Sequence, residues 1–478
     1  MEEKKLVFTI ISGNEEKWVK GFCESIMKAN PYKVCVNLTQ FEDKTEELFR
    51  QYIPADKLLL IKNKWENSFS AARNKCLEII PSDADYLMYV DLDEVITEES
   101  YKGIKELLNH QEIIVPLVTI YNTLDTPGLS ASLFYPRIFP WKSLTKKPFF
   151  EGSVHNQLII DPSIPTVRVP IAVLHYGYAL DKETMKKKHE RSEKLLRGQI
   201  EHDNDDFFAH LNLAQLLRAK GDLLGTEEHA LEVLRIVGDK KGGNFDHAAI
   251  MAMEQLSTSY IGQKRPEEAL EMAQKALTLK PDHLDSIINM ANAYMELNNL
   301  DSAEQWYKRY LFIRSKYNEM RDNTNLILNH LNSSFICWYN LGIIKLMQKK
   351  YKEASEHFYK CYKEEPEFKD AYIRYLHSLQ LSGISVDKLA EYFNKYLEQY
   401  PDKASQVYLF YGELALHECN IELAKFNFYQ ALTLAKNEDE TKMLKNRWIN
   451  LSEIFGQVSN SFFDTSKKID QMKTKMEI

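Results

Sequence analysis

The chain has 478 residues, more than one hydrophobic core usually serves, so we expect two or more domains. Hydrophobic residues make up 44% of the chain and charged residues 27%, a composition that excludes an intrinsically disordered protein. The 61 basic and 69 acidic residues give a net charge of −8, so no general positive field is present to bind nucleic acid.

Between residues 1 and 180, short β-rich runs alternate with helical stretches, a pattern typical of an α/β domain. Strands are predicted at residues 6–12, 33–38, 57–61, 86–90, 113–121 and 167–175. Helices are predicted between them at residues 17–29, 44–52, 70–80 and 98–109, where apolar residues recur at helical spacing. This order predicts a nucleotide-binding sheet with an antiparallel extension.

The strand pattern ends near residue 181. Residues 181–205 have a very polar helical pattern, which predicts a linker helix with a solvated face. Residues 206–460 are predicted to form an all-α solenoid of tetratricopeptide type, with an insertion near residues 313–334 that lengthens one helix or loop. Residues 461–478 are predicted to be a polar C-terminal tail.

A repeated alanine carries the prediction of the solenoid. Ala269 and Ala303 are 34 residues apart, and so are Ala390 and Ala424, which is the tetratricopeptide period. We expect Ala230 to begin the series. A small residue at each of these positions would let two paired helices approach closely, and the stack would leave an extended concave surface.

The cysteines and the hydropathy pattern predict the compartment. The six cysteines are scattered without a C-x-x-C pair, so we expect neither a zinc site nor a disulfide framework. The apolar stretch at the amino terminus is too short for a signal peptide, and no window reaches the roughly 20 apolar residues of a membrane-spanning helix. We therefore expect a cytoplasmic protein with no transmembrane segment.

Two aspartates follow the predicted strand at residues 86–90, in the sequence YLMYVDLDEVI. Strand alternation sends Asp91 and Asp93 to the same side, at the carboxyl end of the strand, where open α/β sheets bind their ligands. Two carboxylates there can hold a divalent cation, and the cation can neutralise a diphosphate. The pattern therefore predicts a metal–diphosphate site, with a turn or helix-capping role as the alternative.

The order of several motifs extends this prediction. The chain reads ISGNEEKWVKGFCESI, then FEDKTEEL, then W-x-x-SFSAARN, then YVDLDEVI. This order resembles the family 2 glycosyltransferases of the GT-A fold. The joined helical repeats make the whole chain similar to the sublancin-type peptide S-glycosyltransferase branch of that family. The resemblance implies that residues 1–180 are a GT-A domain that binds a nucleotide-sugar.

Carried over to matching positions, the resemblance implies a donor pocket. Asn14 and Glu15, in the loop after the first strand, would line the pocket of the base and ribose. Asp43 would belong to the loop after the second strand. Members of the family often have an aspartate just ahead of that loop to bind uracil, whereas this chain offers Asn37 or Thr39, which leaves the base open.

The resemblance also implies which residues face the phosphates. Asp91 would lie near the ribose. Arg73, in SFSAARN, would contact the diphosphate with its guanidinium, with an ordinary surface arginine as the alternative. Arg137, in YPRIF, would face a phosphate of donor or acceptor, with an ion pair to a nearby acid as the alternative.

For the metal, the resemblance implies two protein ligands. Asp93 would be the principal ligand. His175, in the LHYGY sequence that ends the last strand, would be a second, because a neutral imidazole suits Mn²⁺, and Mg²⁺ is the other candidate. A histidine that only fills the core is the alternative. His155 would line the acceptor side or support a metal ligand from behind.

The catalytic base stays open. Relatives commonly read Val-His-Glu where this chain reads Val-His-Asn at residues 154–156. The candidates for the missing carboxylate are Glu94, Glu151 and Asp125, and His155 lies beside the changed position.

The resemblance implies a metal-dependent inverting hexosyltransferase with UDP-glucose or a similar donor. We expect a peptide or protein acceptor, through Cys or Ser/Thr, because the repeats offer a peptide-sized groove and a thiol needs a weaker base. The alternatives are a lipid or surface-saccharide acceptor, and a scaffold that binds a nucleotide without catalysis. A homodimer through the repeats is a further expectation.

Overall fold

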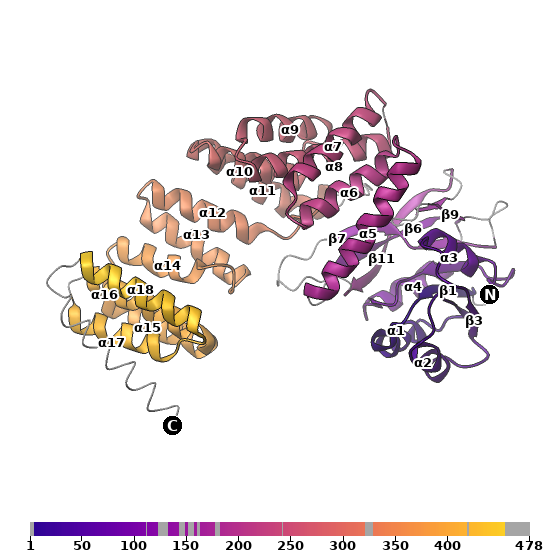
Figure 1. Ribbon diagram of the computed structural model, residues 1–478, viewed down its shortest axis with the longest axis horizontal. Helices are drawn as coiled ribbons and strands as arrows, with labels where there is room; N and C mark the ends of the chain where they lie inside the picture. The colour runs from indigo at the N-terminus through magenta and orange to yellow at the C-terminus, as the bar shows by residue number, and fades with distance from the viewer. Residues whose placement is uncertain are drawn as a thin grey trace. The chain divides into compact units, whose positions relative to one another are not determined.

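The computed structural model divides the chain into two compact units, Met1–Cys337 and Trp338–Ile478. The structure describes residues 4–110, 112–122, 132–142, 149–151, 157–159, 163–176, 182–240, 242–320, 328–417 and 420–454. The first unit contains all described strands and the helices to α11, and the second is helical (Figure 1).

A five-stranded sheet opens the first unit, in the order β3-β2-β1-β4-β8. Its parallel strands are β1 (Leu6–Ser12), β2 (Lys33–Leu38), β3 (Leu58–Lys62) and β4 (Tyr86–Tyr89), and β8 (Ile138–Pro140) joins antiparallel to β4. Because β1 lies between β2 and β4, the carboxyl ends of these three strands meet at one edge. That edge is where the chain reverses its winding direction, the usual ligand site of such sheets.

Helices cover both faces of this sheet (Figure 1). Helices α1 (Glu16–Lys28) and α2 (Thr45–Tyr52) lie on one face, and α3 (Phe69–Leu77) lies on the other. Alternate residues of β1 serve the two faces, since Phe8 packs in the core with α1 and α2 while Val7 packs in the core with α3. The predicted α/β domain is therefore confirmed.

A second sheet continues the domain, in the order β5-β11-β6-β7. Its strands are β5 (Glu94–Ile96), β6 (Val115–Asn122), β7 (Ser132–Pro136) and β11 (Thr166–His175). Strands β9 (Phe149–Glu151) and β10 (Gln157–Ile159) pair antiparallel with each other, and β9 packs against α3. Strand β11 is antiparallel to β5 and parallel to β6. Helix α4 (Ser100–Asn109) packs so closely on β11 that a Cβ at Gly103 would lie 2.4 Å from the carbonyl oxygen of Pro170.

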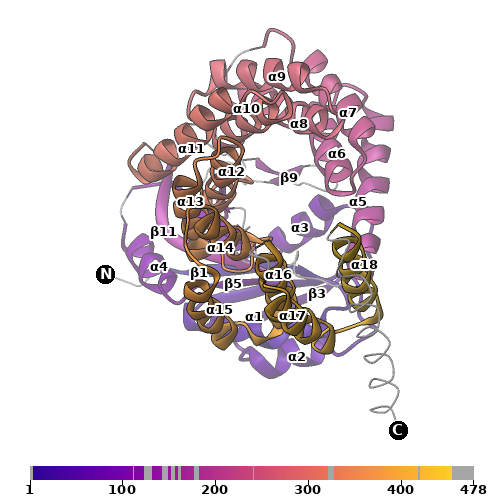
Figure 2. The ribbon, with the colours of Figure 1, turned by 90° about the vertical axis from the view of Figure 1, so that its left-hand side faces the viewer.

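The rest of the chain is helical, and α6 to α11 lie side by side in sequence order (Figure 2). The first unit holds α5 (Lys182–His202), α6 (Phe207–Ala219), α7 (Leu223–Val237), α8 (Asn244–Gly262), α9 (Pro266–Leu279), α10 (Leu284–Glu296) and α11 (Leu300–Met320). The following helices are α12 (Ser334–Met347), α13 (Tyr351–Glu364), α14 (Ala371–Leu381), α15 (Val386–Gln399), α16 (Ala404–His417), α17 (Ile421–Thr433) and α18 (Glu438–Ile454). Leu196 of α5 packs against α6, so the segment predicted as a linker is part of the helical array.

The structure corrects the register of the repeat. Fully buried alanines stand fourth in four of the second helices of the pairs: Ala269, Ala303, Ala354 and Ala424. In α15 the fourth residue is Leu389, which is fully buried, whereas Ala390 is only half-buried. In α7 the fourth residue is Thr226, so Ala230 does not begin the series. When loop lengths vary, the spacing between alanines alone does not identify the repeated position. Counting from the first residue of each helix does identify it.

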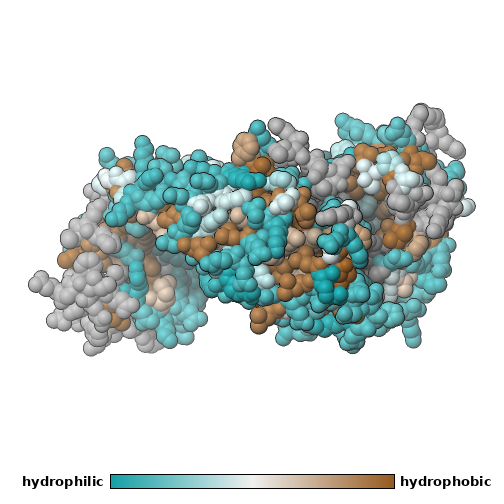
Figure 3. Space-filling view, turned by 90° about the horizontal axis from the view of Figure 1, so that it is seen from above, coloured by the Kyte–Doolittle hydropathy of each residue, from teal (hydrophilic) through white to brown (hydrophobic). Residues whose placement is uncertain are grey.

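The surface mixes hydrophilic and hydrophobic residues on the face shown in Figure 3. Among the described helices, none is long and apolar enough to cross a membrane. The five described cysteines are free and buried.

Candidate active site

The predicted acidic residues lie where the parallel strands end. Asp91 and Asp93 follow β4, and Glu15 follows β1, the neighbouring strand. Burial raises the pKa of Glu15, the backbone N–H of Gly13 opposes this, and the negative charges of Asp93 and Asp91 raise the pKa further. The structure thus brings the first predicted loop and the Asp-x-Asp motif to one place.

Two buried arginines form ion pairs with acidic residues of this motif. Arg73 of α3 donates to Asp91 (2.5 Å), and Arg137 donates to Glu94 (2.6 Å) and lies 3.7 Å from Asp91. Burial by itself would raise the pKa of Asp91, but the charges of Arg73 and Arg137 outweigh burial and hold it below its ordinary value. Of the two roles expected for Arg137, the structure shows the ion pair with a nearby acid.

Tyr89, the last residue of β4, supports both arginines. The guanidinium carbons of Arg73 and Arg137 lie over its ring, 4.8 and 4.6 Å from the centroid. Cation–π contacts of this kind strengthen when the groups are removed from water, and both arginines are buried. The ring of Tyr89 therefore helps to fix the positions of the two guanidinium groups next to Asp91.

The two predicted metal ligands are neighbours. His175 Nε2 lies 3.4 Å from Asp93 Oδ2. Strand β11 places His175 opposite Glu94 of β5, and Tyr176 donates its backbone N–H to the Asp93 carbonyl (2.8 Å). Burial lowers the pKa of His175, but its hydrogen bond with Asp93 and the surrounding acids raise the pKa above the ordinary value.

This pair fits a divalent ion in spacing and chemistry. Two neighbouring ligands of one octahedral ion, each at about 2.1 Å, lie about 3.0 Å apart, and the 3.4 Å between Asp93 Oδ2 and His175 Nε2 is close to this value. Over the described parts of the chain, no group of three or more His, Cys, Asp and Glu side chains could hold a metal ion. Water and a bound diphosphate would be suitable further ligands for a cation held by Asp93 and His175, as they commonly are for small hard cations.

Hydrogen bonds join the loops after β1 and β2. Asn14 donates to the Glu42 carboxylate (2.6 Å) and accepts the Glu42 N–H (3.0 Å). Asp43 accepts the N–H of Glu16 (3.1 Å) and of Thr45 (2.9 Å), at the starts of α1 and α2. Burial would raise the pKa of Asp43, but its bonds with Thr45 and Glu16 lower it. Asp43 thus holds the two loops together through its carboxylate.

Residues 8–156 match the family described as glycosyl transferase family 2. Residues 206–282 and 260–321 match tetratricopeptide repeats. The chain carries a family 2 glycosyltransferase domain. Tetratricopeptide repeats follow it, so the expected combination of the two is confirmed.

Two relatives that are named as glycosyltransferases support an enzyme. The chain is 25% identical over 347 residues to the SPbeta prophage-derived glycosyltransferase SunS of Bacillus subtilis (strain 168), covering 69% of this chain and 77% of the relative. The same values hold for the glycosyltransferase SunS of Bacillus phage SPbeta. A solved tetratricopeptide repeat protein from Parabacteroides merdae ATCC 43184 is 18% identical, covers 55% of this chain and 92% of its own, and has a TM-score of 0.36. The protein is a glycosyltransferase.

The candidates for the base of this glycosyltransferase have different surroundings. Glu94 is 2% exposed, and its two oxygens accept from Arg137 (2.6 Å) and from the Asp91 N–H (2.8 Å). It does not fit the predicted role of a base, because neither oxygen is open to an acceptor. Glu151 is exposed on β9, and its role as a base stays a prediction. Asp125 and His155 lie outside the described residues.

Sequence reasoning missed the part that Asn74 plays in the glycosyltransferase domain. Its side chain donates to the carbonyl of Phe150 (3.0 Å) and accepts the N–H of Phe150 (2.7 Å), as a neighbouring strand would. Phe150 packs edge-on against Tyr89, with ring centroids 5.2 Å apart. Asn74 therefore fixes the strand that carries Glu151. The only signal was its place in SFSAARN, directly after Arg73.

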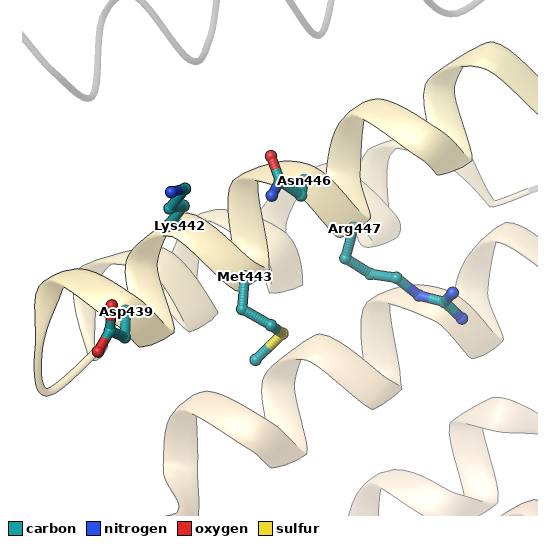
Figure 4. A pocket seen from close by; sticks show the side chains of 5 residues that line it. All are labelled: Asp439, Lys442, Met443, Asn446 and Arg447. Atoms are coloured by element: carbon teal, nitrogen blue, oxygen red, sulfur yellow. The ribbon is translucent and has the colours of Figure 1, made fainter.

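A shallow pocket on α18 is not a second site of this chemistry. Figure 4 shows that its side chains come from one helix and do not converge. They are Asp439, Lys442, Met443, Asn446 and Arg447. Arg447 is bound to Glu413 (2.7 Å), and the pocket contains neither paired carboxylates nor a histidine.

Proposed function

We propose that this glycosyltransferase is metal-dependent and transfers a hexose from a UDP-sugar to an acceptor with inversion at the anomeric carbon. The observation that carries the proposal is the Asp93–His175 pair (3.4 Å), placed beside Asp91 at the carboxyl edge of the sheet. Nucleotide ligands bind at this edge in open α/β sheets, and the family 2 match at residues 8–156 covers Asp91 and Asp93.

Asp93 and His175 would hold Mn²⁺ or Mg²⁺ together with the diphosphate of the donor. Such an ion stabilises the negative charge that develops on the departing nucleoside diphosphate. Arg73 adds positive charge at the same place, and its buried Nε–H has no hydrogen-bond partner in the structure, which leaves a donor for a phosphate oxygen. Asp91, held by Arg73, would face the ribose.

The rest of the donor would lie over the joined loops. Asn14 and Glu15 are at the end of β1, on the side of Asp91 and Asp93, where the base and ribose would fit. Asn37 is fully buried, donates to the carbonyl of Ala72 (2.8 Å) and accepts from Asn63, so it is an unsuitable reader of the base. We therefore assign the base pocket to the loops after β1 and β2.

For the acceptor we propose a Cys or Ser/Thr side chain of a peptide or protein. Glu94 forms an ion pair with Arg137, and Asn156 stands where relatives commonly have a glutamate. Of the predicted bases among the described residues, we therefore propose Glu151. A cysteine acceptor asks less of a base, since a thiol with a pKa near 8.5 is already partly ionised at neutral pH. Mass spectrometry of peptides incubated with a panel of nucleotide-sugars would identify donor and acceptor together.

Replacing the principal metal ligand tests the mechanism. We expect Asp93→Asn to lower Mn²⁺-dependent hydrolysis or transfer of the donor about 100-fold or more, because the charge that holds the cation is lost. The protein should keep its fold, since the Asp93 side chain is 20% exposed and the backbone bond to Tyr176 remains.

Asp83→Asn is the matched control, because Asp83 belongs to another Asp-x-Asp sequence but pairs with Lys5 at the opposite end of β1. It should keep full activity. Equal rates for Asp93→Asn and the native chain, or equal rates with and without Mn²⁺, would refute the metal-dependent mechanism.

A further inference from the structure

A tryptophan on α1 lies against the chain that leaves the proposed metal-binding strand. The rings of Trp18 and Tyr176 stack, with centroids 6.3 Å apart and planes 25° apart. Tyr176 directly follows His175, and its backbone N–H binds the carbonyl oxygen of Asp93 (2.8 Å). The stacked pair is therefore one residue away from one proposed ligand and is hydrogen-bonded to the other.

The pairing of β11 shows why this contact matters. The last residue of β11 in register with both neighbours is His175, which is opposite Glu94 of β5 and Asn122 of β6. Tyr176 follows the last paired residue of β11. Residues at the ends of elements separate from their neighbours more easily than residues in the middle. The direction of the His175 ring depends on its backbone, so any contact that fixes Tyr176 also fixes the ligand.

Trp18 is a firm support for Tyr176. Trp18 lies in the first turn of α1 and packs against the hydrophobic core between α1 and the sheet. Lys17 Nζ lies 4.8 Å from the centroid of its ring. The start of α1 is tied by the bond from the Glu16 N–H to Asp43 (3.1 Å). Stacked aromatic pairs contribute about 0.5 to 1.5 kcal/mol beyond the area they bury.

We infer that Trp18 is a positioning residue, which acts through Tyr176 to hold His175 beside Asp93 for the divalent cation. This inference rests on the metal site of the proposed function. Groups that orient a ligand from behind commonly change metal affinity 10- to 100-fold when they are lost. Because α1 begins directly after Glu15, the same helix supports the donor loop and the metal ligand.

The test measures binding of Mn²⁺ to the full chain in the presence of saturating UDP, by the electron paramagnetic resonance signal of the free ion. We expect Trp18→Ala to raise the Kd for Mn²⁺ about tenfold. Trp18→Phe, which keeps a ring to stack on Tyr176, should stay near the native value. Trp306→Ala is the matched control, since Trp306 is a half-buried tryptophan of α11 with Arg309 over its ring (4.8 Å), and it should change nothing.

In assays of turnover, Trp18→Ala should raise the KM for Mn²⁺ and leave kcat at saturating Mn²⁺ near native. A folded Trp18→Ala protein, checked by circular dichroism and melting, that binds Mn²⁺ as tightly as the native chain would overturn the inference. If Trp18→Ala does not fold, Tyr176→Leu removes the same stack from the other side and decides the question by the same criterion.

His175→Ala separates this inference from the proposed function. If His175→Ala and the native chain bind Mn²⁺ equally, the metal site itself is wrong, and the inference falls with it. If His175→Ala loses Mn²⁺ affinity and Trp18→Ala does not, only the positioning role is wrong.

Discussion

Asp93 and Glu94 are neighbours in the chain, yet their side chains have opposite surroundings. The Asp93 side chain is 20% exposed and has His175 beside it, whereas the Glu94 side chain is 1% exposed and bound to Arg137. Burial raises the pKa of Glu94, the charge of Arg137 opposes this, and the charge of Asp91 adds to it. One carboxylate is thus placed to bind a ligand, and the other neutralises a buried arginine.

Removing Glu94 should therefore reduce stability before it affects chemistry. We expect Glu94→Ala to lower the free energy of unfolding of the first unit by about 3 kcal/mol, because Arg137 would keep a buried, unpaired charge. Urea unfolding followed by circular dichroism measures this. The double variant Glu94→Ala/Arg137→Met should recover much of the loss, since no lone charge remains. A Glu94→Gln protein as stable as the native chain but inactive would instead support the predicted role of a base.

At the scale of helices, a histidine pair joins the first repeat. His210 of α6 and His229 of α7 are buried, and their Nδ1 atoms are 3.0 Å apart. Burial lowers the pKa of His229, and the charge of His210 lowers it further. The native state therefore prefers the neutral form of His229, in which one ring can donate to the other.

The sign of the pH effect follows from this shift. The unfolded chain binds a proton at His229 near pH 6.5, and the native chain binds it only at lower pH, so unfolding takes up a proton in between. Stability is complete above about pH 6.5 and falls as the pH is lowered toward the native pKa. Melting temperatures of the native chain and of His229→Gln between pH 7.5 and 5.5 test this, and His229→Gln should lose less. His110→Gln, at an exposed site, should follow the native chain. Parallel curves for all three proteins would refute the role of His229.

The sequence predicted long elements well and short ones poorly. The predicted strands at residues 6–12 and 33–38 coincide with β1 and β2, because each is a mostly apolar run in a buried parallel sheet. Strands β5, β8, β9 and β10 have three residues each, too few to show a period, and were not predicted. The pair of Arg137 with Glu94 spans 43 residues of sequence, and only the antiparallel addition of β8 to β4 brings the two together. The proximity of Asp93 and His175 was expected only from the family resemblance, because β4 and β11 belong to different sheets and the strand pattern alone does not bring their ends together.

At the scale of the whole molecule, the chain has two compact units, and the proposed donor and metal residues all belong to Met1–Cys337. A ligand that binds only the native state stabilises the unit that holds its site by mass action. Chains with more than one unit commonly unfold in more than one step. Binding of the donor should therefore be visible as a change in one step.

We expect UDP together with Mn²⁺ to raise the unfolding temperature of the first unit by several degrees and to leave that of Trp338–Ile478 unchanged. At ligand concentrations 100 times the Kd, the stabilisation is about 2.7 kcal/mol. Scanning calorimetry measures both steps, and EDTA should abolish the shift because Asp93 and His175 need the cation to hold the diphosphate. Asp93→Asn should show the EDTA result even with Mn²⁺ present. A shift of equal size with EDTA would show that UDP binds without a metal, and a shift confined to the second unit would place the nucleotide site outside the sheet domain.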